Sequence, residues 1–207
     1  MKKQSLFFWD LMAKSYSKST IADEASYQVK LEKTREYLNP ETELFEFGCG
    51  TGSTAILHAP FVKHILATDG SKKMIKIAQE KADAADIQNI TFEATTIDDS
   101  VPTKETYDVV MGMSILHLVK DEKTVIAKVY DTLKPGGVFI SSTACLGNTS
   151  ILITLLSKVS WIVGLTINVF TSEELQASLV EAGFEIEHVW RPDSEGIKAT
   201  FIIAKKV

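Results

Sequence analysis

The chain has 207 residues, of which 45% are hydrophobic and 24% are charged, and these values predict one globular domain. Its net charge of −5 offers no basic field for a phosphate backbone, so nucleic acid is excluded as an expected partner. Two cysteines are too few for a secreted disulfide framework, and the apolar part of MKKQSLFFWD is too short for a secretory signal, so a cytoplasmic location is expected.

Hydrophobic periodicity predicts that strands and helices alternate along most of the chain. The first forty residues read as helical, including a helix over 23–38 that Asn39-Pro40 ends. Strands are expected at 43–47, 64–69, 89–94, 107–113 and 137–143, and helices from the glycines to about Pro60, at 71–85 and at 121–133. A capping box of Thr171 and Glu174 begins a last helix, and 184–190 and 198–206 are expected to pair as antiparallel strands. This order predicts an α/β fold with a mostly parallel sheet covered on both faces.

Three glycines follow the first expected strand, in the stretch LFEFGCGTGSTA from Leu44 to Ala55. Gly48, Gly50 and Gly52 permit a tight turn, leave the backbone open to a ligand and lead into a helix whose first N–H groups are unpaired. Asp69 ends the next strand, at a spacing that suits an acid accepting hydrogen bonds from ribose hydroxyls. A tight turn without ligand and a helix-capping Asp69 are the alternatives, but the two features together favour a nucleoside.

The spacing of the glycines separates this loop from two other nucleotide-binding loops. Ser53 stands where the third glycine of the dinucleotide fingerprint would fall, and the Gly-Lys-Ser/Thr of a P-loop is absent. The loop, the acid and the strand order resemble the class I S-adenosylmethionine-dependent methyltransferases. The matching stretches are LFEFGCGTG (44–52), ATDGSKKMIKIA (67–78), YDVVMGMSILHLV (107–119), LKPGGVFI (133–140) and FTSEELQASLVEAGFEIEHV (170–189), and FFWDLMAKSY (7–16) is similar to the start of many small-molecule members.

The resemblance implies a Rossmann-like, doubly wound sheet of seven strands, mostly parallel with an antiparallel last strand and with helices on both faces. It implies a single methyltransferase domain over 1–207 with four parts. These are an N-terminal helical cap (1–39), a cofactor-binding core (40–143), an apolar lid or insertion (144–170) and a C-terminal helix and strand pair (171–207).

The resemblance also implies a site for S-adenosyl-L-methionine, with S-adenosyl-L-homocysteine as the product. In that site Glu46 orients the loop and the amino group of the methionine part, and Asp69 holds the ribose hydroxyls. Thr95 occupies the place of an acid that takes the adenine amino group in many members, and Asp98 substitutes for it if the loop shifts. The full expected set is Glu46, Gly48, Cys49, Gly50, Gly52, Asp69, Gly70, Ser71, Met74, Thr95, Thr96, Ile97 and Met111.

On the acceptor side, the resemblance places Ser114, His117 and Trp161 at the pocket for the second substrate. His117 is a candidate base, and a partly buried structural histidine is the alternative. Cys49 has no paired base, so it is interpreted as a small residue that fits the loop rather than as a nucleophile. The histidines lack metal-ligand spacing, and no metal site is expected.

These observations predict methyl transfer to a small, apolar or uncharged acceptor by in-line displacement. A non-enzymatic sensor or regulatory subunit that binds the same cofactor is the main alternative. A nicotinamide-dependent oxidoreductase is disfavoured by Ser53 and by the lack of a Tyr-Lys or Cys-His pair for hydride transfer. The sequence does not indicate an oligomeric state.

A long stretch with few charges lies between the fifth and sixth expected strands, and Lys158 is the only charged residue from Gly136 to Ser172. Residues 151–165 read as an apolar helix with one polar stripe, which we interpret as a lid over an apolar acceptor pocket that includes Trp161. A buried core helix and a peripheral membrane contact are the alternatives. The central Lys158 argues against an integral membrane span.

Overall fold

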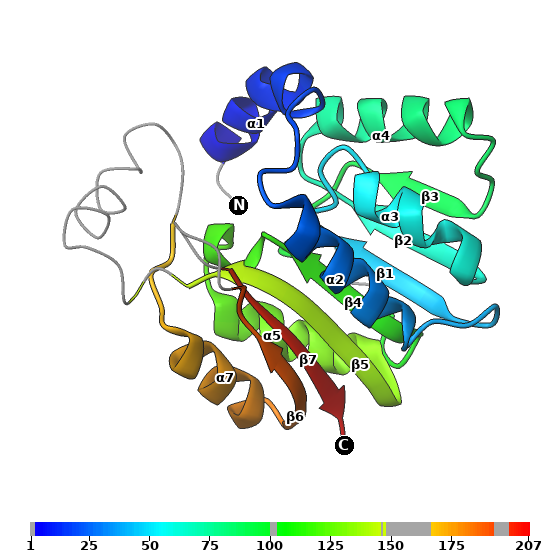
Figure 1. Cartoon of the computed structure of the whole chain (residues 1–207). Helices are drawn as coiled ribbons and strands as arrows, with labels where there is room; N and C mark the ends of the chain where they lie inside the picture. The colour runs from blue at the N-terminus through cyan, green and yellow to red at the C-terminus, as the bar shows by residue number, and fades with distance from the viewer. Residues whose placement is uncertain (1–2, 100–102, 146, 148–166, 193–198) are drawn as a thin grey trace.

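The computed structural model describes residues 3–99, 103–145, 147, 167–192 and 199–207 (Figure 1). Helices α1 (Lys3–Tyr16) and α2 (Glu24–Arg35) precede the first strand. The strands are β1 (Glu43–Phe47), β2 (His64–Thr68), β3 (Ile90–Glu93), β4 (Tyr107–Met113), β5 (Leu133–Ala144), β6 (Phe184–Trp190) and β7 (Ala199–Lys206). Between them lie α3 (Ser53–His58), α4 (Lys72–Ala84), α5 (Glu122–Thr132) and α7 (Ser172–Glu181), with the 3₁₀ turns η1 (Ala59–Phe61) and η2 (Leu116–Leu118).

The strands form one seven-stranded sheet in the order β3-β2-β1-β4-β5-β7-β6. The pairs from β3 to β5 are parallel, whereas β7 lies between β5 and β6 and is antiparallel to both. The expected fold class, including the antiparallel last strand, is therefore confirmed. In such a sheet ligands bind beyond the carboxyl ends of the strands, where the winding reverses between β1 and β4.

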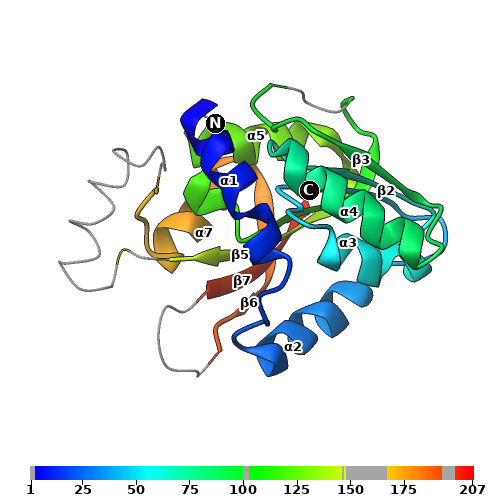
Figure 2. The same cartoon turned by 90° about the horizontal axis from the view of Figure 1, so that it is seen from above.

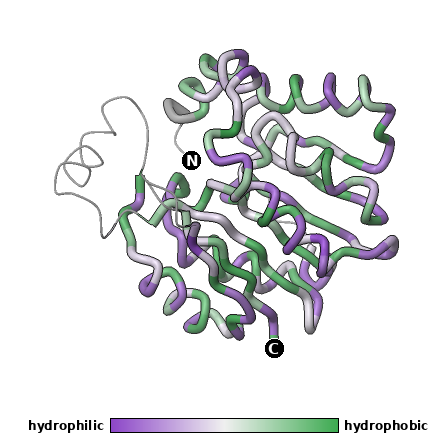
Figure 3. Tube along the Cα trace, viewed as in Figure 1, coloured by the Kyte–Doolittle hydropathy of each residue, from purple (hydrophilic) through white to green (hydrophobic). Residues whose placement is uncertain are grey.

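Two hydrophobic cores lie on the two faces of the sheet because successive strand residues point to opposite sides. Phe45, Val110 and Phe139 belong to the core that also contains the buried residues of α5 and α7. Leu44, Val109 and Ile140 belong to the core that contains Ala55 of α3 and Ala59 of η1. Figure 2 shows α5 and α7 on one side of the sheet and α2 and α3 on the other, and Figure 3 shows hydrophobic residues along the central strands.

Capping side chains begin the helices at the expected places. The Thr171 hydroxyl accepts a hydrogen bond from the Glu174 N–H, and the Glu174 carboxylate accepts one from the Thr171 N–H, which is the expected capping box. Ser71 caps α4 by accepting from the Met74 N–H at 3.1 Å. These caps fix where each helix leaves the edge of the sheet at which ligands bind.

Two element boundaries differ from the sequence pattern. Helix α2 ends at Arg35 rather than near Leu38, because Tyr37 and Leu38 donate to carbonyl groups three residues back and tighten the last turn. Strand β5 begins at Leu133 rather than at Gly137. Leu133 pairs with Tyr107 of β4, and the register shifts before Val109, so the Lys-Pro-Gly-Gly stretch is an irregular start of the strand.

Among the residues that the structure describes, no helix is long and apolar enough to cross a membrane. The expected lid helix at 151–165, with Trp161, lies outside the described residues. The described part of the chain also contains no group of three or more His, Cys, Asp or Glu side chains that could hold a metal ion.

Candidate functional site

Two adjoining cavities lie at the carboxyl ends of the parallel strands. The first has a volume of about 90 Å³, and Asp69, Met74 and the loop after β3 contribute to its wall. The second has a volume of about 710 Å³ and includes Glu46 and Lys30. The cavities meet because both are lined by Tyr16, Gly48, Gly50, Met113 and Ser114. An elongated ligand could therefore extend from one into the other past the glycine loop.

The glycines of the loop have left-handed backbone angles, with φ of 69°, 55° and 74° at Gly48, Gly50 and Gly52. At Gly50 an added Cβ would have Tyr16 Cε1, 3.6 Å away, as its nearest neighbour, so this residue leaves the backbone open to both cavities. At Gly52 an added Cβ would lie 2.8 Å from Ala78 Cβ of α4. Gly52 therefore lets the loop pack against α4, and it lines neither cavity, contrary to the expectation that all three glycines face the ligand.

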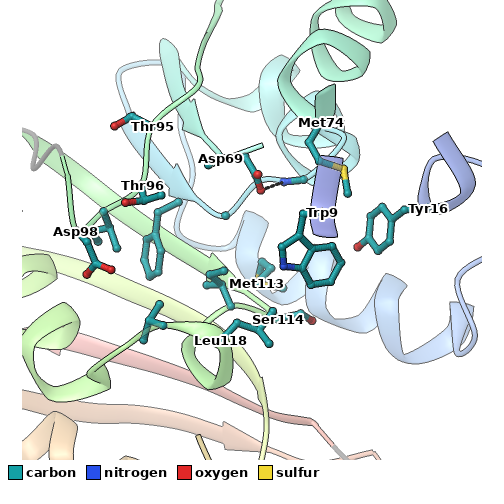
Figure 4. A pocket seen from close by; sticks show the side chains of 17 residues that line it. Trp9, Tyr16, Asp69, Met74, Thr95, Thr96, Asp98, Met113, Ser114 and Leu118 are labelled. Atoms are coloured by element: carbon teal, nitrogen blue, oxygen red, sulfur yellow. Dashed lines mark hydrogen bonds between the residues drawn. The ribbon is translucent and has the colours of Figure 1, made fainter. Parts of the chain in front are cut away.

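Asp69 connects the loop to the end of β2. Its Oδ2 accepts a hydrogen bond from the Gly50 N–H at 3.0 Å (Figure 4), and its Oδ1 accepts one from the Ser71 N–H at 2.8 Å. Burial raises the pKa of the Asp69 carboxyl, and the two N–H donors oppose that effect. Each carboxylate oxygen can accept a second hydrogen bond, so Asp69 can both hold the loop and accept from a ligand in the first cavity.

Glu46 is a buried acid in the wall of the second cavity, with 1% of its surface exposed. Burial, together with the neighbouring Asp69, raises the pKa of its carboxyl to about 8. Its Oε2 has no hydrogen-bond partner among the described residues. A buried carboxyl oxygen without a partner is costly, so this position suits a cationic or hydrogen-bond-donating group of a ligand.

The loop after β3 brings four consecutive residues to the first cavity, namely Thr95, Thr96, Ile97 and Asp98. The Thr96 hydroxyl donates to Asp99 Oδ2 at 2.7 Å, and the Asp99 N–H donates to the Thr96 carbonyl at 3.0 Å. This turn carries Asp98 to the cavity wall. The side chains of Thr95 and Asp98 therefore both line this edge of the first cavity.

Helix α1 closes the first cavity from above. Asp10 accepts a hydrogen bond from the Ser71 hydroxyl at 2.5 Å and one from the Lys73 N–H at 3.1 Å, and Leu6 packs over Gly70. Trp9 and Tyr16 from the same helix line the cavity, and Figure 4 shows them opposite Thr95, Thr96 and Asp98. The site residues expected from the sequence do not include Trp9 or Tyr16. The helical spacing of Leu6, Trp9 and Ala13 is the signal that points to this face of α1.

The residues at the end of β4 differ from the expectation for Met111. Met111 is fully buried in the core on the α3 side, whereas Met113, Ser114 and Ile115 line the first cavity. The strand ends at Met113, as the sequence predicts, and Met111 lies two residues before that end, within the sheet and away from the ligand-binding edge. Ser114 follows with a left-handed φ of 56°, and its N–H donates to the Ser142 carbonyl at 2.7 Å.

Three further residues of the expected site, His117, Cys49 and Ser71, differ in whether they line a cavity. His117 lines neither cavity, because in η2 it is Leu118 that faces the first cavity while Leu116 is buried in the core. Burial lowers the pKa of the His117 imidazole. Cys49 lines the second cavity, and burial raises the pKa of its thiol, which disfavours the nucleophilic thiolate. Ser71 caps α4 and lines neither cavity, whereas Gly70 and Met74 line the first.

The sequence matches a family model described as a methyltransferase domain over residues 44–137. It is 24% identical over 100 residues to the uncharacterized methyltransferase YcgJ of Bacillus subtilis, a match that covers 48% of this chain and 40% of that protein. It is 27% identical over 100 residues to a ubiquinone biosynthesis O-methyltransferase of Mesorhizobium japonicum, with the same coverage. The chain thus spans about two fifths of the length of these curated relatives.

The fold is shared with solved structures over most of the chain. The crystal structure of the B. subtilis YcgJ protein superposes with a TM-score of 0.74 at 16% identity and covers 86% of this chain and 98% of that one. A geranyl diphosphate methyltransferase solved with SAM superposes with a TM-score of 0.72 at 16% identity and covers 86% and 85%. The sequence match lies over the strands that carry the loop, Asp69 and β4, and the fold extends the likeness to the whole sheet. Residues 44–137 thus match a methyltransferase domain, and the described chain has the fold of solved methyltransferases.

Proposed function

We propose that this protein transfers the methyl group of S-adenosylmethionine to a small, uncharged acceptor by in-line displacement. The observation that carries the proposal is the pair of cavities that meet at Gly48 and Gly50, with Asp69 in one and Glu46 in the other. A molecule with a nucleoside at one end and an amino acid at the other matches this arrangement. The sequence relatives and the shared sheet support the same reaction class.

The residues of the first cavity fit the nucleoside part of the cofactor. Asp69 has acceptor capacity left for the ribose hydroxyls, and Asp98 offers a carboxylate to the adenine amino group. Met74 and Ile97 supply apolar surface, and Trp9 supplies an aromatic face on which a base can stack. These groups also exclude water from one side of the site.

The residues of the second cavity fit the amino-acid part. Glu46 has an unpartnered buried oxygen that suits an ammonium group. Lys30 lies in the same wall and can offer an ammonium group to the carboxylate of an amino acid. Burial lowers the pKa of Lys30, and Asp23 opposes that shift. An acid and a base in one cavity match the two charges of an amino acid.

When bound, S-adenosylmethionine supplies a methyl group that is activated by the positive charge on its sulfur. The protein contributes orientation, because the loop at Gly50 and the edge at Met113 and Ser114 confine both reactants where the cavities meet. Orientation of this kind can lower a barrier by roughly 7–11 kcal/mol. Burial raises the pKa of the Tyr16 hydroxyl at this junction, so the hydroxyl stays protonated at neutral pH and is a poor base.

The test combines binding and turnover on the purified protein. Calorimetry should show that S-adenosylhomocysteine binds, and that NAD binds no better than background. With a metabolite extract as the source of acceptor, S-adenosylhomocysteine should then form from S-adenosylmethionine. Tighter binding of NAD would contradict the proposal. Binding without turnover in every acceptor pool would favour a sensor or regulatory subunit instead.

A further inference from the structure

The second cavity differs chemically from an apolar acceptor pocket. Half of the residues that line it carry a hydroxyl group, and they come from the segment between α1 and α2, from α2, from the glycine loop and from the ends of β4 and β5. Only two of its lining residues, Ile21 and Met113, have large aliphatic side chains. The wall therefore offers hydrogen-bonding groups within surface that is largely apolar, so a few hydroxyl groups can fix the orientation of a ligand.

Ser142 is a residue of this wall whose buried hydroxyl group forms no hydrogen bond among the described residues. It is 2% exposed, it lies near the carboxyl end of β5, and its Oγ has no hydrogen-bond partner among the described residues. Leaving a buried hydroxyl without a partner is unfavourable, so a ligand that supplies the missing hydrogen bond gains by comparison.

Ser142 is also held in a fixed position beside the junction of the two cavities. Its carbonyl accepts from the Ser114 N–H at 2.7 Å, and Ser114 lines both cavities. Ser114 has a left-handed backbone angle although it is not glycine, a strained conformation that is concentrated at functional sites. In the sheet, β4 separates β5 from β1, so Ser142 and Glu46 line the cavity from either side of Ser114.

We infer that the Ser142 hydroxyl recognises a hydroxyl or carbonyl oxygen of the acceptor. Ser142 is then a specificity-determining residue, and the acceptor is an uncharged compound that forms hydrogen bonds rather than a hydrocarbon. This inference rests on the proposed function, because it assigns the part of the second cavity that the amino-acid end of the cofactor leaves vacant. It rests on described residues alone and is independent of the lid expected at residues 151–165, which lie outside the described part of the chain.

The test compares small probes that differ by one hydroxyl group, namely phenol with toluene and cyclohexanol with methylcyclohexane. Their affinities are measured by saturation-transfer NMR, with and without saturating S-adenosylhomocysteine. The variants are Ser142→Ala, Ser142→Thr and Thr143→Val. Thr143 is a matched control, because it is the next residue of β5, is fully buried with an unpartnered hydroxyl and lines neither cavity.

The wild type should bind the hydroxylated member of each pair more tightly. Ser142→Ala should weaken that member about tenfold while leaving the apolar member and S-adenosylhomocysteine unchanged, since a hydrogen bond of about 1.4 kcal/mol is lost. Ser142→Thr should restore the preference, and Thr143→Val should keep it. The inference is overturned if the hydroxylated probes bind no better than the apolar ones, or if both alanine and valine variants behave alike. If the wild type does not bind S-adenosylhomocysteine, the proposed function is contradicted instead. The probe affinities measured without S-adenosylhomocysteine still test the role of Ser142 in that case.

Discussion

The two cavities share a wall, yet they are built from different kinds of residue. The first is enclosed by apolar and aromatic side chains from α1, α4 and the ends of β3 and β4, with Asp69 as its fixed acid. The second is lined by hydroxyl groups and by residues from separate segments between Tyr16 and Ala199. Under the proposed function, the first cavity is the recognition site for the nucleoside of the cofactor (the cofactor half), and the second holds the amino-acid end of the cofactor and leaves the rest of its hydroxyl-rich wall for the acceptor (the acceptor half).

Gly50→Val should have the largest effect and should act on the cofactor half. Valine resists the φ of 55°, and its branched side chain would enter the space that the two cavities share. We expect S-adenosylhomocysteine affinity to fall by at least about a hundredfold, or 2.7 kcal/mol, in calorimetry. Gly136→Val is the control, because Gly136 has a φ of 77° but open space around it. If both variants lost affinity equally, backbone strain rather than ligand contact would be the cause.

Asp69→Ala should weaken cofactor binding about ten- to a hundredfold, because charge-assisted hydrogen bonds to the ribose are worth roughly 1.5–3 kcal/mol. The Gly50 and Ser71 N–H groups also lose their acceptor, so thermal unfolding is measured alongside. Asp69→Asn retains the size of the side chain and one carbonyl oxygen, and it should fall between the alanine variant and the wild type. Unchanged affinity in a folded Asp69→Ala variant would show that the ribose assignment is wrong.

Trp9→Ala should lower cofactor affinity about tenfold, because stacking of a base on an aromatic ring contributes roughly 1–3 kcal/mol. Phe7 provides the matched control, since it is an aromatic residue of the same helix, is 71% exposed and lines neither cavity. Phe7→Ala should leave binding unchanged in the same titration. Equal losses in the two variants would mean that α1 acts only through its helical stability.

The smallest expected effect is a pH dependence that originates in Glu46. Its carboxyl has a pKa of about 8 in the free protein, and the ammonium group of the ligand favours the ionised form, so binding releases a proton. Affinity should therefore rise with pH up to about 8, by about fivefold between pH 7 and pH 8. Calorimetry in buffers of different ionisation enthalpy measures the proton directly. Glu46→Gln should remove the dependence, and a dependence that survives this change would assign the proton elsewhere.

The cofactor half was largely predictable from the sequence because its parts occur in a short ordered stretch. The strand, the glycines and Asp69 are close in sequence, and their spacing encodes their juxtaposition at one sheet edge. Met111 shows the limit of that argument, since the pattern predicts the bounds of β4 correctly but not that Met111 packs in the core while Met113 lines the cavities. The burial of Met111 depends on contacts with distant segments, which the local sequence does not encode.

The acceptor half was not predictable in the same way. Ser142 looks like any small strand residue in the sequence, and its importance comes from a missing hydrogen bond that only packing creates. His117 has a residue type suited to catalysis, but one position in a 3₁₀ turn decides that Leu118 faces the cavity in its place. Trp9 and Tyr16 reach the site because Asp10 binds the start of α4, which is a contact between distant segments.

The position of β7 has a consequence for how the protein folds during its synthesis on the ribosome. Every residue of the first cavity is found at or before Val119, whereas the wall of the second includes Ser142, Pro192 and Ala199. Strand β7 inserts between two strands made earlier, so the sheet beside β5 completes only after residues 199–206 have emerged. A nascent chain thus carries all the groups that hold the methyl donor before it can build the compartment for the molecule that receives the methyl group.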